Sequence, residues 1–167
     1  SDILFVNTCT IRENADDKLY GTLGQLKVWK NNSSNRKLLV GGCAAQKDKE
    51  LVRDRAPWVD VVIGTHNTND VINLLNQSDD WGPITKIVEE TLDIETEILP
   101  VRESGFSAFV TIQIGCNNSC TFCIVPSVRG VEISRRPSDI INEIKNLSNE
   151  GVKEITLLGQ NVNSYGR

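Results

Sequence analysis

Short apolar runs alternate with segments of helical periodicity along the first hundred residues, and this alternation limits the chain to few folds. Continuous apolar runs over residues 3–8, 37–42 and 59–63 indicate strands that are buried on both faces. We expect helices over residues 19–29, 45–56 and 69–75, and a further strand over 84–88. The sequence therefore predicts the α/β class, with a parallel sheet covered by helices on both faces.

A second block of strand, helix and strand follows an acidic stretch that has no helical period. Apolar residues alternate over 106–114 and indicate a strand, and residues 154–158 indicate another. Between them we expect a helix with Ser138 as N-cap and an apolar stripe of Ile140, Ile141, Ile144 and Leu147. We therefore expect a Rossmann-like domain over residues 1–101 and a second, incomplete α/β block over residues 102–167.

Composition excludes several classes of protein. The net charge of -4 gives no overall positive field that would attract a phosphate backbone. A nucleic-acid substrate would therefore be bound largely by other parts of the protein. No apolar run approaches the roughly 18 residues of a membrane span, and no signal peptide is present, so we expect a cytoplasmic protein. The chain has no Met and opens in mid-strand at Ile3, which predicts a segment truncated at both ends.

Three of the five cysteines fall within eight residues, as Cys116, Cys120 and Cys123. In a reducing compartment this C-x3-C-x2-C spacing favours metal ligation over disulfides. Three thiolates can hold three irons of a four-iron cluster and leave the fourth open to a substrate, because no fourth cysteine follows. A zinc module would need four nitrogen or sulfur ligands, and an iron–sulfur electron carrier should bind all four irons with protein ligands. Both alternatives stay open at this point.

The cysteine spacing, with the aromatic Phe122 before the last cysteine, resembles the radical S-adenosylmethionine (SAM) superfamily. In that superfamily SAM binds the open iron and yields a 5′-deoxyadenosyl radical. The resemblance implies that residues 102–167 are the start of a partial TIM-type barrel. Four further segments are similar to the methylthiotransferase family: residues 7–12 (NTCTIR), 41–44 (GGCA), 129–137 (RGVEISRRP) and 158–166 (LGQNVNSYG). The last segment is similar to the tRNA-modifying branch. The resemblance implies addition of a methylthio group to C2 of N6-isopentenyladenosine next to the anticodon. A ribosomal protein or another modified adenosine is the alternative substrate.

Cys9 and Cys43 each follow a strand of the first block, at the edge where open α/β sheets build their sites. A single cysteine in such a place is commonly a small buried hydrophobe. The resemblance implies that both hold an auxiliary 4Fe–4S cluster together with a third cysteine. That third cysteine is absent from this sequence, and we expect the truncation to have removed it. Two 4Fe–4S clusters and SAM are thus the implied cofactors.

Five further residues are candidates for contacts to SAM because they lie in the cysteine loop, just beyond it, or at the end of the second barrel strand. They are Phe122, Glu132, Arg135, Gln160 and Asn161. The alternative for the charged members is a solvated surface position. The resemblance also implies tRNA and an electron donor such as flavodoxin or ferredoxin as partners, with no membrane and a monomeric state. We expect the segment alone to be inactive.

Overall fold

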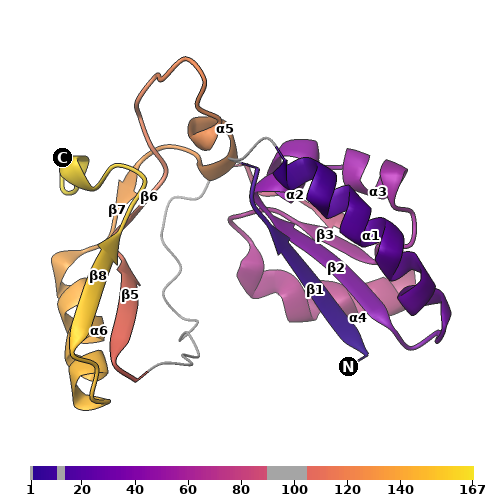
Figure 1. Ribbon diagram of the computed structural model, residues 1–167, viewed down its shortest axis with the longest axis horizontal. Coiled ribbons are helices and arrows are strands. Elements are labelled where there is room, and N and C mark those ends of the chain that lie inside the picture. Colours follow the sequence, from indigo (N-terminus) through magenta and orange to yellow (C-terminus); the bar gives the residue numbers. More distant parts are fainter. Residues whose placement is uncertain (1, 11–13, 90–104) are drawn as a thin grey trace.

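The first unit of the protein is a four-stranded parallel sheet (Figure 1). The computed structural model describes residues 2–10, 14–89 and 105–167. The strands lie side by side in chain order: β1 (Ile3–Thr8), β2 (Lys37–Gly42), β3 (Val61–Ile63) and β4 (Ile84–Lys86). Every neighbouring pair is parallel, so all four carboxyl ends meet at one edge. The predicted bounds of β1 and β2 are confirmed, whereas β3 and β4 are shorter than predicted.

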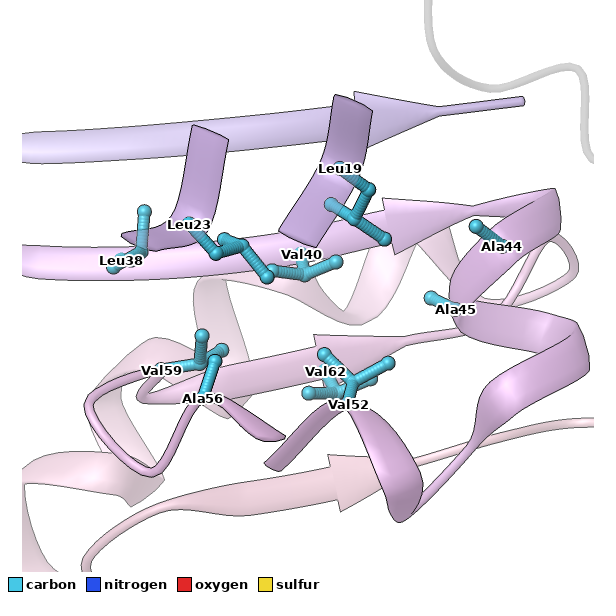
Figure 2. Close-up of a cluster of buried hydrophobic side chains, with 10 residues drawn as sticks. All are labelled: Leu19, Leu23, Leu38, Val40, Ala44, Ala45, Val52, Ala56, Val59 and Val62. Carbon is cyan, nitrogen blue, oxygen red and sulfur yellow. The ribbon is translucent and has the colours of Figure 1, made fainter. Parts of the chain in front are cut away.

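Helices cover both faces of this sheet, as predicted. One face carries α1 (Ala15–Asn31), α2 (Cys43–Asp48) and α3 (Leu51–Arg55). Figure 2 shows the core beneath them, where α1 places Leu19 and Leu23 against Val40 and its neighbours. The opposite face carries α4 (Val71–Trp81), whose Leu74 and Leu75 pack on Leu39, Val61 and Ile63. Burial of these aliphatic side chains supplies most of the favourable free energy of folding.

Two predicted helices differ from the structure. The helix expected over residues 45–56 is divided into α2 and α3, because Lys49 between them has a positive φ of 51° that no helical residue adopts. The helix expected over 69–75 begins with a 3-10 turn, η1 (Thr68–Asp70), and continues as α4 to Trp81. Its buried residues are Leu74, Leu75 and Ser78, whereas Ile72 is 66% exposed.

The second unit consists of two parallel strands, β5 (Ser107–Thr111) and β8 (Glu154–Leu158), joined through α6 (Pro137–Asn149). The α6 helix packs its Ile140 and Leu147 against Ala108 and Val110 of β5. This is the α/β arrangement expected at the start of a barrel. The N-cap is Arg136 rather than Ser138, because the fixed φ of Pro137 suits the first helical position. Ile141 is half exposed, and the acidic stretch over residues 89–104, in which we expected a linker, lies outside the described residues except for Glu89.

A segment between β5 and α6 departs from simple strand-helix alternation. The long strand predicted over 106–114 is divided into β5 and a short β6 (Gln113–Ile114), which pairs antiparallel with β7 (Ile133–Ser134). The cysteine loop and a short helix, α5 (Val125–Arg129), lie between β6 and β7, and α5 contacts α2 of the first unit (Figure 1). A 3-10 turn, η2 (Val162–Ser164), follows β8. None of the helices in the described ranges is both long and apolar enough to cross a membrane.

Candidate functional site

The cysteine loop is fixed at its base by the segment that returns from α5. The backbone N–H of Cys116 donates to the carbonyl of Gly130 at 3.3 Å, and the N–H of Glu132 donates to Oδ1 of Asn117 at 2.9 Å. Gly115 has a φ of +72°, and a Cβ atom there would collide with the backbone of Val131. The sequence thus places glycine where the returning backbone approaches most closely.

The tip of this loop faces solvent. Cys116 is buried, whereas Cys120 and Cys123 are exposed, and the Phe122 side chain is 94% exposed. Cys123 donates its backbone N–H to the carbonyl of Cys120 at 3.1 Å, which forms a tight turn between these two residues. Two of the three predicted ligands are therefore open to an incoming group, and the third lies at the anchored base.

The donor set fits an iron–sulfur cluster, although the loop is not arranged around one. Three thiols in a loop that contains no His, Asp or Glu are the ligand type that such clusters take. Among residues 2–10, 14–89 and 105–167, no three His, Cys, Asp or Glu side chains are gathered closely enough to hold a metal ion. The ligand roles of Cys116, Cys120 and Cys123 accordingly remain predictions from sequence.

Cys9 and Cys43 lie at the carboxyl edge of the first sheet. Thr8 and Gly42 are register partners at the ends of β1 and β2, so the next residue of each strand emerges at the same edge. Cys43 opens α2 and is 2% exposed, whereas Cys9 is exposed. The predicted placement of both residues is thus seen in the structure, and their ligand role stays a prediction.

Arg129 is a residue of this region that our reading of the sequence did not single out. It ends α5, and its Nε lies 3.2 Å from Sγ of Cys43. A second contact joins α5 to the first unit, because Oγ1 of Thr65, in the loop after β3, donates to the carbonyl of Val128 at 2.8 Å. The only local signal was the position of Arg129 within the segment RGVEISRRP, which carries no information about a partner 86 residues away.

His66 lies beside the same contact. Burial, together with the positive charge of Arg129, holds the pKa of His66 below its ordinary value of 6.5. In the described part of the chain its Nε2 is buried and has no hydrogen-bond partner. The imidazole is therefore neutral in the folded protein at neutral pH.

We expect His66 to make the first unit less stable in acid. Below about pH 6.5 the unfolded chain binds a proton that the folded chain does not, so stability falls as the pH drops through this range. The urea concentration at the midpoint of unfolding should therefore be lower at about pH 5.5 than at about pH 7.5, and this difference should be smaller in His66→Gln. Tryptophan fluorescence can follow this unfolding, because all three tryptophans (Trp29, Trp58 and Trp81) precede residue 90. An equal fall in both proteins would contradict the assignment.

The five candidates for SAM contacts differ in their surroundings. The Arg135 side chain is 8% exposed and donates through Nη1 to the carbonyl of Thr111 and to Oε2 of Glu143, each at 2.7 Å. It therefore ties β5 to α6, which is a structural role that the sequence did not predict. Glu132 holds the loop base through its backbone, and the backbone carbonyl of Asn161 accepts from Ser164. Gln160 and Phe122 are exposed, and contacts of all five to SAM stay predictions.

Comparison with known proteins finds two separate matching segments in the chain. Residues 1–64 match the Uncharacterized protein family UPF0004, and residues 110–167 match the Radical SAM superfamily. Proteins named tRNA-2-methylthio-N(6)-dimethylallyladenosine synthase are similar over 99% of this chain. The one from Cutibacterium acnes is 54% identical, that from Tropheryma whipplei 53%, and that from Mycolicibacterium smegmatis 52%.

The chain spans about a third of the length of these curated relatives: 34%, 36% and 33% of the three proteins respectively. The superfamily match covers β6, the cysteine loop with Cys116, Cys120 and Cys123, and the elements α5, β7, α6 and β8 that follow it. A radical SAM domain works with a 4Fe–4S cluster and SAM. Residues 110–167 are therefore part of a Radical SAM domain, and residues 1–64 are part of a UPF0004 domain.

Proposed function

We propose that this chain serves a radical SAM methylthiotransferase that modifies C2 of N6-isopentenyladenosine next to the anticodon in tRNA. The observation that carries the proposal is the 50–54% identity, over nearly the whole chain, to relatives named for synthesis of a 2-methylthio derivative of N(6)-dimethylallyladenosine in tRNA. The identity extends across both matched segments, the second of which contains the cysteine loop. That breadth favours one shared reaction over a shared superfamily alone.

The cysteine loop supplies the ligands in this proposal. Cys116, Cys120 and Cys123 hold a 4Fe–4S cluster, and the lack of a fourth cysteine in the loop leaves room for SAM. When bound, the cluster with SAM supplies the one-electron chemistry needed at a base C–H that is too weakly acidic for an ordinary general base. The exposed Cys120 and Cys123 lie on the side from which these groups would enter.

The first unit contributes a second site in this proposal. Cys9 and Cys43, brought to one edge of the parallel sheet, hold an auxiliary 4Fe–4S cluster with a third cysteine outside this chain. We further propose two domains, over residues 1–101 and 102–167, in a cytoplasmic, monomeric enzyme that receives electrons from a flavodoxin or a ferredoxin. Since the net charge of this chain is -4, we expect tRNA to be gripped largely by other parts of the protein.

The open iron provides the test. Adding SAM to the reduced, anaerobically reconstituted intact protein should shift its electron paramagnetic resonance spectrum and release 5′-deoxyadenosine slowly without tRNA. Adding tRNA that carries N6-isopentenyladenosine should then give the 2-methylthio nucleoside, detected by mass spectrometry of the digested RNA. An unchanged spectrum at saturating SAM would favour an electron carrier. A shifted spectrum without the RNA product would indicate that the substrate is a ribosomal protein or another modified adenosine.

A further inference from the structure

The contact between Arg129 and Cys43 joins the two groups of cysteines across the two units. Nε of Arg129 donates to Sγ of Cys43 at 3.2 Å. A thiol sulfur is a weak acceptor, and a negatively charged sulfur is a much stronger one. Because Cys43 is 2% exposed, little water competes for its sulfur. The geometry therefore suits a sulfur that carries negative charge, as a metal ligand does.

The same residue lies next to the anchor of the cysteine loop. Gly130 follows Arg129 and accepts the backbone hydrogen bond of Cys116 at 3.3 Å. A single peptide unit thus separates the donor to Cys43 from the acceptor of Cys116. The bond between Thr65 and Val128 holds α5 to the first unit at the preceding residue. Displacement of Arg129 would consequently move the base of the loop as well.

We propose that Arg129 is a positioning residue that raises the reduction potential of the group bound at Cys43 and fixes the base of the cysteine loop. This inference rests on the proposed auxiliary cluster at Cys9 and Cys43. A positive charge and an N–H donor at a ligating sulfur stabilise the reduced state, which carries one more negative charge. The fixing of the loop base depends only on residues of this chain and needs no metal.

The first test measures the potential of the auxiliary cluster by itself. In the intact protein, Cys116, Cys120 and Cys123 are all changed to Ala, so that a reconstituted cluster resides at Cys9 and Cys43. Arg129→Gln should lower its midpoint potential by about 59 mV, a tenfold change in the one-electron equilibrium. Arg129→Lys should recover part of the shift because it restores the charge. Lys145→Gln removes one exposed positive charge from α6 and should leave the potential unchanged. Equal potentials in Arg129→Gln and its parent would overturn the proposal.

The second test needs no cluster. In the metal-free intact protein with its loop cysteines present, hydrogen exchange is measured for residues 116–130. Arg129→Gln and Cys43→Ala should each speed exchange, and the double variant should add nothing to either, because both remove one bond. Additive effects would overturn the positioning role. If no cluster forms at Cys9 and Cys43 in any variant, the proposed auxiliary site is wrong, and this exchange cycle still decides whether Arg129 holds the loop.

Discussion

Changing Cys120 to alanine in the intact protein is expected to abolish the SAM-linked cluster and the release of 5′-deoxyadenosine. The substitution removes one of only three thiolates in the loop, and the described chain gathers no neighbouring set of ligands that could replace it. The same loss is expected for Cys116→Ala and Cys123→Ala. Iron content after reconstitution and the SAM-dependent paramagnetic resonance spectrum measure the effect.

Two kinds of variant control this result. Ser119→Ala changes an exposed neighbour in the same loop and should keep both the iron and the spectrum. Cys9→Ala and Cys43→Ala remove thiols of the other site and should also keep the SAM-dependent spectrum. A full SAM-linked cluster in any one of the three loop variants would refute the ligand assignment.

Gly115→Ala is expected to disrupt the same loop without removing a ligand. The new Cβ would overlap the carbonyl group of Val131 and the carbonyl oxygen of Gly130, which are backbone atoms that cannot rotate away. The φ of +72° adds strain for any residue with a side chain. Together these effects should destabilise the second unit by about 2–4 kcal/mol and sharply reduce cluster loading. Hydrogen exchange of residues 107–134 and iron content would measure both.

Substitutions at two other glycines show how much of that effect comes from backbone conformation rather than from the close approach of Val131. Gly166 has a φ of +78° with nothing near its would-be Cβ, so Gly166→Ala should show the conformational strain alone, about 1 kcal/mol. Gly24 lies inside α1 with open space around it, and Gly24→Ala should stabilise the first unit by about 0.5–1 kcal/mol. If Gly115→Ala cost no more than Gly166→Ala, the close approach of Val131 would not matter.

Much of the fold could be predicted from local sequence patterns. The runs that became β1, β2 and β8 have the predicted bounds, because each is a short apolar run that ends at, or is followed by, a polar residue or a glycine. The elements that were not predicted are short and depend on distant partners. The α5 helix and the β6–β7 pair exist because the cysteine loop must close, and the break at Lys49 reflects how α2 and α3 pack rather than any periodicity.

The candidate site was predictable in its ligand types and only partly in its geometry. Cysteine spacing is a local property, so Cys116, Cys120 and Cys123 were identified directly, and the edge position of Cys9 and Cys43 followed from the strands. Arg135 was expected to contact SAM, and its pairing with Glu143 could not be anticipated from charge alone. The bond from Arg129 to Cys43 spans 86 residues and becomes visible only when the two units are placed together.

The two units differ in what each needs for its core, and this difference has a consequence for synthesis on the ribosome. The first unit has its sheet covered on both faces by helices encoded before residue 90. In the second unit Phe109, on the face of β5 opposite to Ala108 and Val110, is 69% exposed, and two parallel strands are too few to be stable alone. We therefore expect the nascent chain to fold its first unit early, while β5 and β8 remain a target for chaperones until further strands emerge.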